Sequence, residues 1–238
     1  MRATESRHRP AGSGRWLGIL MLDTRFPRPP GDIGNPVTFE RLGIPVRHLV
    51  VRGAAPAAIV RGRDPAALAP FLAAARALAA EGAALLSTSC GFLVRHQAEL
   101  QAAVAVPVVS SSLLQCAGLP APGIVTIDAA ALDPATLAAA GVAPGTPVAG
   151  VAPGSSFQRA ILGDEPALDP AAACADVVAA ARSLQARAPA LGSIVLECTN
   201  MPPYHDAVAA ACGVPVHDIV SLLAARWQAL GSPGGDPA

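Results

Sequence analysis

Short apolar runs alternate along the chain with alanine-rich segments, several of which open with helix-capping residues. Such runs are typical of buried β-strands, and Asp-Pro at residues 64–65 and 169–170 is typical of helix starts. We predict strands over residues 16–22, 45–51, 83–87, 106–109, 123–127, 147–152, 193–196 and 214–216. We predict helices over residues 64–80, 93–103, 134–140, 169–188, 204–211 and 218–230, and a long Pro/Gly loop over 23–40. This alternation indicates an α/β fold of mostly parallel sheets with helices on both faces.

An internal repeat divides the predicted elements into two halves. The sequence Val-Pro-Val at residues 106–108 recurs at 214–216, and at the same offset of 108 residues Cys90 falls on Cys198. Each cysteine follows an apolar strand and precedes a helix. We therefore predict two similar lobes, each of which presents one cysteine at the carboxyl end of a strand, where open α/β sheets bind ligands.

The repeat sets the expected domain boundaries. We predict a first α/β lobe over residues 16–118 and a second over 119–230, and the C-terminal helix could pack on the first lobe. Residues 1–15 and 231–238 are expected to be disordered tails. No apolar stretch reaches the roughly 20 residues of a membrane span, and the N-terminus lacks a signal-peptide pattern. We therefore expect a cytoplasmic protein.

Composition excludes several classes of function. The 17 basic residues are all arginine and are balanced by 17 acidic residues, so no net positive charge favours nucleic acid. Because the chain has no lysine, it cannot form a Schiff base or anchor pyridoxal phosphate, and it lacks a Walker-type phosphate loop. The five cysteines show no metal or redox spacing, so we expect free thiols and no metal site.

The two repeated cysteines have chemically suggestive neighbours. Residues 87–92 read Ser-Thr-Ser-Cys-Gly-Phe, and residues 197–203 read Glu-Cys-Thr-Asn-Met-Pro-Pro. Helix N-termini offer free N–H groups to an anion and are expected to lower the pKa of a nearby thiol. If the lobes face each other, two thiols flank one small anion, and one can remove a proton from a carbon while the other delivers one. Cys116, Cys174 and Cys212 lie in alanine-rich helical contexts and are expected to be small hydrophobic residues.

These motifs resemble those of the Asp/Glu/hydantoin racemase superfamily, which includes arylmalonate decarboxylase and maleate isomerase. The resemblance covers residues 16–230, and Cys-Thr-x-x-Pro from Cys198 to Pro202 matches the second cysteine motif of the superfamily. It implies two pseudo-symmetric α/β lobes with the active site in the cleft between them. It also implies that Cys90 and Cys198 are the catalytic acid/base pair. The residues that would bind the substrate carboxylate are Thr88, Ser89, Gly91, Thr199, Asn200 and Asn35.

The function implied is that of a cofactor-independent isomerase, a racemase or epimerase acting at the α-carbon of an amino acid or hydantoin-like carboxylate. Two departures keep alternatives open. Thr88 and Ser89 before Cys90 resemble the decarboxylase branch, in which Ser87 could align with the racemase cysteine, although the repeat favours Cys90. Asn200 stands where amino-acid racemases have His or Glu. An arylmalonate-type decarboxylase, a maleate-type cis-trans isomerase and a non-catalytic small-acid-binding protein are the alternatives.

The expected partner is a small carboxylate substrate, with no nucleic acid, no membrane and no metal or organic cofactor. A homo-oligomer is compatible with this interpretation.

Overall fold

A computed structural model of the protein describes residues 14–231. The predicted tails lie outside this range, apart from residues 14, 15 and 231. Arg15 places its guanidinium carbon 5.3 Å from the ring centroid of Trp227. Within residues 14–231, every helix is too short or too polar to span a bilayer.

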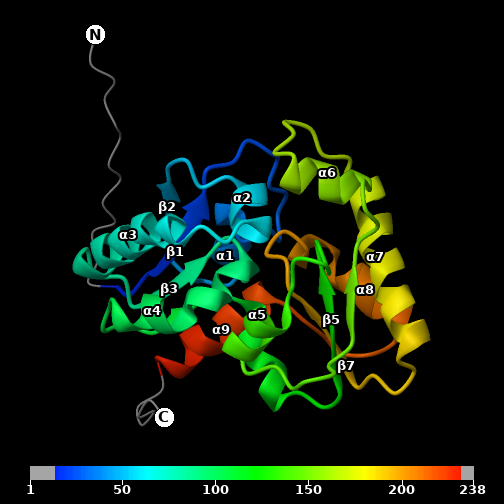
Figure 1. The fold of residues 1–238 in the computed structure, drawn as a ribbon. Helices are drawn as coiled ribbons and strands as arrows, with labels where there is room; N and C mark the ends of the chain where they lie inside the picture. Colours follow the sequence, from blue (N-terminus) through cyan, green and yellow to red (C-terminus); the bar gives the residue numbers. More distant parts are fainter. Residues whose placement is uncertain (1–13, 232–238) are drawn as a thin grey trace.

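Two four-stranded parallel sheets form two lobes that lie side by side (Figure 1). The first contains β1 (Leu17–Leu22), β2 (Val46–Val51), β3 (Leu85–Thr88) and β4 (Val108–Val109), in the order β2-β1-β3-β4. The second contains β5 (Pro122–Thr126), β6 (Val148–Gly150), β7 (Ser193–Leu196) and β8 (Val216–His217), in the order β6-β5-β7-β8. The strand order is identical in the two sheets, and every pairing is parallel. The predicted α/β class and two-lobe arrangement are confirmed.

The repeat in the sequence is also a repeat in backbone hydrogen bonding. The N–H of Leu86 donates to the carbonyl of Pro107 over 2.9 Å, and the N–H of Ile194 donates to the carbonyl of Pro215 over the same distance. Both bonds join the penultimate strand of a sheet to its last strand, and their residues are 108 positions apart. Each proline is tolerated because its missing N–H is not needed for this bond.

Helices cover both sheets. The α-helices are α1 (Pro36–Glu40), α2 (Pro56–Arg61), α3 (Leu68–Ala80), α4 (Gln97–Ala102), α5 (Pro134–Ala139), α6 (Ser156–Leu162), α7 (Pro170–Arg187), α8 (His205–Cys212) and α9 (Ile219–Ala229). Short 3-10 helices are η1 (Pro65–Ala67), η2 (Gly91–His96), η3 (Ser112–Gly118) and η4 (Pro202–Tyr204). Three α-helices, α1, α2 and α6, were not predicted, and α1 lies inside the expected loop over 23–40. The predicted helix over 93–103 is divided into η2 and α4.

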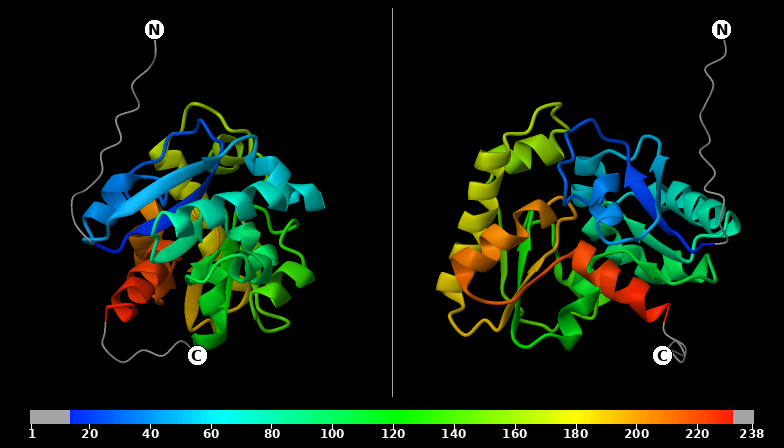
Figure 2. Two further views of the ribbon diagram at one scale, coloured as in Figure 1. Left: turned by 90° about the vertical axis from the view of Figure 1, so that its left-hand side faces the viewer. Right: turned by 180° about the vertical axis from the view of Figure 1, so that it is seen from behind.

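One hydrophobic core runs through both lobes, and a second cluster lies on the outer face of the first sheet. The second cluster joins Phe39 of α1 and Ile219, Leu222 and Leu223 of α9 to the strands of the first sheet. The C-terminal helix α9 thus crosses from the second lobe to cover the first (Figure 2). Because the core continues between the lobes, the two lobes pack directly against each other, which buries residues at their boundary.

Candidate active site

Two strand-to-helix turns face each other across the boundary between the lobes. The first follows β3 and carries Cys90, and the second follows β7 and carries Cys198. Both cysteines line one small cavity of about 20 Å³, and each is only 6% exposed. The carboxyl ends of parallel strands are where open α/β sheets bind ligands, so this cavity is the candidate active site.

The two turns are joined directly to each other. The hydroxyl of Thr199 donates to the backbone carbonyl of Ser89 over 2.7 Å. Gly91 lies so close to Glu197 that a Cβ atom on residue 91 would overlap both the side-chain Oε1 and the backbone oxygen of Glu197. A glycine after Cys90 is therefore required for the close approach of the second turn.

Four of the six predicted carboxylate-binding residues line the cavity with the two cysteines, namely Ser89, Gly91, Thr199 and Asn200. The hydroxyl of Ser89 accepts from the backbone N–H of Leu22 over 2.8 Å, which leaves its own hydrogen available as a donor. Much of the remaining wall is apolar and is formed by Leu22, Phe26, Pro56, Val60, Phe92, Ile127 and Ile161. The cavity wall thus combines polar groups of the two turns with apolar side chains.

Thr88 and Asn35 do not line this cavity, and their side chains have other partners. The Thr88 hydroxyl lies 2.9 Å from the backbone carbonyl of Cys90 and 2.8 Å from that of Ser110. The Asn35 side chain caps α1 by accepting from the N–H of Val37 over 3.0 Å. In this structure Thr88 thus stabilises the first turn and Asn35 stabilises a helix start, and their role in substrate binding stays a prediction.

The alternative alignment of Ser87 with the racemase cysteine is not favoured by the geometry. Ser87 lies within β3, and its hydroxyl donates to the backbone carbonyl of Val109 over 2.7 Å. Ser87 is absent from the cavity lining, which Cys90 reaches.

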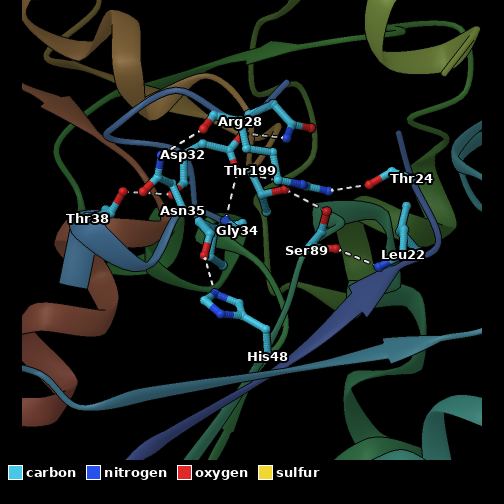
Figure 3. A network of polar contacts seen from close by, with 12 residues as sticks. Leu22, Thr24, Arg28, Asp32, Gly34, Asn35, Thr38, His48, Ser89 and Thr199 are labelled. Carbon is cyan, nitrogen blue, oxygen red and sulfur yellow. Dashed lines mark hydrogen bonds and ion pairs between the residues drawn. The ribbon is translucent and has the colours of Figure 1, made fainter. Parts of the chain in front are cut away.

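A buried carboxylate supports the second turn from the first lobe. Asp32, 1% exposed, accepts from the Asn200 side-chain amide over 2.7 Å through Oδ2. Its Oδ1 accepts from Arg28 over 2.9 Å and from the N–H of Gly34 over 2.7 Å (Figure 3). Asn200 Oδ1 in turn lies 3.6 Å from the sulfur of Cys198. The network fixes which way the Asn200 amide faces and so gives the Cys198 thiol a defined acceptor.

Both thiols are held in their neutral form. Burial raises the pKa of Cys90 to about 12, and the charge of Glu197 acts in the same direction, against the N–H groups of Phe92 and Leu93. Burial and the same carboxylate also raise the pKa of Cys198 well above its ordinary value. The expectation that the helix N-termini lower these pKa values is therefore wrong, because desolvation outweighs the backbone donors.

Glu197 was missed in the sequence analysis. It is fully buried, and burial raises the pKa of its carboxyl to about 7. Its Oε2 accepts from the Thr126 hydroxyl over 2.8 Å, whereas its buried Oε1 has no hydrogen-bond partner among the described residues. A signal was present in the sequence: the repeat aligns Glu197 with Ser89, so a carboxylate ends an apolar strand directly before a candidate catalytic cysteine.

The cavity therefore combines proton carriers with hydrogen-bond donors and an apolar wall. Its ionisable side chains are the two thiols and the Glu197 carboxyl. Within residues 14–231, no cluster of three or more His, Cys, Asp or Glu side chains is suited to hold a metal ion. The chemistry available to these side chains is proton transfer to and from a small bound molecule.

Comparison with known proteins gives relatives along most of the chain, although no family model matches it. The dimethylsulfoniopropionate lyase of Durusdinium sp. clade D is 30% identical over 220 residues, which cover 86% of this chain and 71% of that protein. The chain belongs to the family of this lyase. Dimethylsulfoniopropionate lyase 5 of Emiliania huxleyi is 28% identical over 225 residues, which cover 87% of this chain but 44% of that protein. The chain thus spans only part of the length of these relatives.

Solved structures share the fold of this lyase family member. Allantoin racemase from Pseudomonas fluorescens superposes with a TM-score of 0.60 at 16% identity, over 93% of this chain and 99% of that one. Arylmalonate decarboxylase superposes with a TM-score of 0.57 at 19% identity, over 92% and 94% of the two chains. An aspartate racemase homologue from Pyrococcus horikoshii and a glutamate racemase from Francisella tularensis share the fold as well, as the resemblance noted in the sequence implies.

Proposed function

We propose that the protein is a lyase that removes the α-proton of a small carboxylate and expels the substituent on its β-carbon. The observation that carries this proposal is the meeting of Cys90 and Cys198 in one buried cavity, each at the end of an equivalent strand. Such a cavity suits proton removal next to a carboxylate. The family supports the elimination, since its curated relatives bear the name dimethylsulfoniopropionate lyase.

Cys198 is the proposed base, because the network from Asp32 through Asn200 orients its thiol. As the thiolate, it takes the α-hydrogen, and the developing negative charge moves onto the substrate carboxylate. The Ser89 hydroxyl and backbone N–H groups of the two turns are the proposed donors to that charge. The bond from the β-carbon to the leaving group then breaks, the leaving group keeps the electron pair, and an α,β-unsaturated acid remains.

The apolar wall supports a substrate whose leaving group cannot form hydrogen bonds. A dimethylsulfonium group has methyl substituents and a positive charge but no N–H or O–H. The rings of Phe26 and Phe92 line the cavity, and aromatic faces attract methylated cations. Dimethylsulfoniopropionate is therefore the substrate that we would test first.

The test measures release of dimethyl sulfide into the headspace and loss of the substrate α-hydrogen in deuterated water. We expect Cys198→Ser to lower both rates by about 10²–10⁴-fold, the contribution of a positioned proton carrier. Cys174→Ser is the matched control, because Cys174 is a half-buried residue of α7 outside the cavity lining. Full activity in Cys198→Ser, or no release of dimethyl sulfide from this substrate by the unaltered protein, would contradict the proposed reaction.

Racemisation or epimerisation is the second candidate, and the mirrored position of the two thiols favours it. A racemase needs a proton carrier on each face of the carbon, so Cys90→Ser would abolish racemisation in both directions. An elimination needs only one such group, so the same variant would keep dimethyl sulfide release within about 10-fold of the unaltered protein. A panel of amino acids, hydantoins and arylmalonates in deuterated water completes the comparison, because α-hydrogen exchange reports each reaction.

A further inference from the structure

The carboxyl of Glu197 has one oxygen without a hydrogen-bond partner among the described residues. Its Oε2 is held by the Thr126 hydroxyl at 2.8 Å. Its Oε1 is buried without a hydrogen-bond partner among residues 14–231, in a residue that lines the cavity with both cysteines. A buried, unpaired polar atom costs free energy, and such atoms in a native structure call for an explanation.

The position of Glu197 is where the two otherwise equivalent lobes differ. The N–H of Ser89 donates to the carbonyl of Leu20 over 2.9 Å, and the N–H of Glu197 donates to the carbonyl of Val125 over 2.8 Å. The backbone is thus the same in both turns, but one has a hydroxyl and the other a carboxyl. The carboxyl Oε1 crosses to Gly91 of the first lobe, where only a glycine leaves room for it.

The thiols require a proton acceptor that the rest of the cavity does not supply. Since burial raises the pKa of Cys90 to about 12, only a very small fraction of this thiol is ionised at neutral pH. Among the residues that line the cavity, Glu197 has the only carboxyl group. The charged or titratable groups that face it are Cys90, Cys198 and Arg95, and Arg95 lowers its pKa.

We propose that Glu197 is a third acid/base residue of this cavity, whose free Oε1 takes the proton of the attacking cysteine thiol. The S–H bond breaks, a thiolate and a protonated carboxyl form, and the thiolate then takes the α-hydrogen and becomes a thiol again. In an elimination, the carboxyl releases its proton to water when the product leaves. In a racemisation, the second thiol protonates the carbon and regains a proton from Glu197. The inference rests on the proposed function, but it holds for either reaction.

The decisive variant is Glu197→Gln, which keeps the shape and an acceptor for Thr126 but cannot take up a proton. We expect turnover of dimethylsulfoniopropionate to fall by about 10²–10³-fold with little change in KM. The unaltered protein should lose activity as pH falls through about 7, where Glu197 becomes protonated, and the variant should lack this limb. Unchanged turnover would overturn the proposal. A raised KM with retained kcat would also overturn it, and would instead make Glu197 a binding partner of the cationic group.

Alkylation by iodoacetamide separates this proposal from the proposed function, because it needs no substrate. Removal of the Glu197 charge should lower the pKa of both thiols and make their alkylation several-fold faster at pH 8. Thiols that ionise more easily in a variant that turns over more slowly indicate a lost proton acceptor, not lost thiols. If the alkylation rates of Glu197→Gln equal those of the unaltered protein, Glu197 is not coupled to the thiols and the proposal fails, whatever the substrate.

A second variant tests the same assignment if Glu197→Gln folds poorly. The Thr126 hydroxyl lowers the pKa of Glu197 by hydrogen bonding to its charged form. Thr126→Val removes that bond and nearly preserves side-chain volume, so the acid limb of kcat/KM should move to higher pH. A limb that stays in place in Thr126→Val would show that another group titrates, and would overturn the assignment.

Discussion

Glu197 places an ionisable carboxyl where the ionised form is poorly solvated. Burial raises its pKa to about 7 from an ordinary 4.5, so the native state holds this proton more tightly than the unfolded chain. Its contribution to stability is fully present below about pH 4.5 and is lost as pH rises through 7. We expect Glu197→Gln to be more stable than the unaltered protein by about 3 kcal/mol at pH 8 and nearly equal at pH 4. Urea unfolding at both pH values measures this, and a pH-independent difference would contradict it.

Both oxygens of the buried Asp32 carboxylate accept hydrogen bonds. Its replacement should therefore lower both the free energy of unfolding and the activity. In Asp32→Asn, an NH2 group replaces one of the two carboxylate oxygens and must face the donor of either Arg28 or Asn200. Arg28 also loses its counter-charge. We expect a loss of about 3 kcal/mol in the free energy of unfolding and a fall in kcat, because the acceptor of the Cys198 thiol is no longer held. The exposed Asp206→Asn should stay within about 0.5 kcal/mol in the same urea titration. Equal free energies of unfolding in the two variants would contradict a stabilising role of Asp32.

At the level of single residues, the sequence repeat allowed the two cavity cysteines to be predicted. It could not predict which neighbouring side chains point into the cavity. Cys90 and Cys198 could be paired because the offset of 108 residues aligns them. Thr88 and Asn35 are near the first turn and the first loop in sequence, but their hydrogen bonds turn them away from the cavity. The repeat marks the position of Glu197, but its raised pKa could not be predicted from the sequence, because the burial that raises it depends on both lobes together.

Among the elements, the strands could be predicted and the short helices could not. A buried strand in a parallel sheet is a continuous apolar run, whereas α1, α2 and α6 are five to seven residues long. Helices this short are not stable by themselves. The first two begin with proline, which also reads as a loop signal. Tertiary contacts with the first sheet and with the cavity wall stabilise them.

The approach of the two turns should be sensitive to one methyl group. In Gly91→Ala, the new Cβ would overlap the Oε1 and backbone oxygen of Glu197, so either the turn or the carboxyl must move. We expect about 1–3 kcal/mol lower stability and a loss of most activity. Gly118→Ala is the matched control in the same lobe, since a Cβ there meets nothing within 4 Å. A crystal structure of Gly91→Ala with both turns unmoved, or full activity in that variant, would show that the close approach is not required.

At the scale of the whole molecule, the two lobes present two equivalent turns. The differences between the lobes give the two thiols unequal surroundings. The two lobes share the strand order, the backbone hydrogen bond to a proline carbonyl and the cysteine after the third strand. The carboxyl at Glu197 and the Asp32–Asn200 support occur only on the side of Cys198 among these equivalent positions. A symmetric cavity would suit two-way proton transfer, whereas this asymmetry supports the proposal that Cys198 is the base that removes the α-proton.

Ion pairs between the lobes should control entry to the cavity. Arg25 pairs with Asp164 over 3.1 Å, and the same carboxylate accepts from the N–H of Phe26, whose side chain lines the cavity. Arg61 with Asp128, at 2.8 Å, and Arg63 with Asp133, at 2.9 Å, also join the two lobes. Since both cysteines are almost fully buried, a substrate can reach them only when the cavity opens, and we expect the opening on the side that carries these ion pairs.

Loss of one such pair should therefore speed alkylation of Cys198. Asp164→Gly removes the carboxylate and tolerates the positive φ of 51° at this position. An exposed pair contributes up to about 1 kcal/mol, so we expect about five-fold faster modification by iodoacetamide, followed by peptide mass spectrometry. Glu81→Gln breaks the Arg47–Glu81 pair within the first lobe and should leave the rate unchanged. About 1 M NaCl should raise the rate in the unaltered protein by screening, and should do so less in Asp164→Gly. Equal rates in Asp164→Gly and Glu81→Gln would mean that the cavity opens by another route.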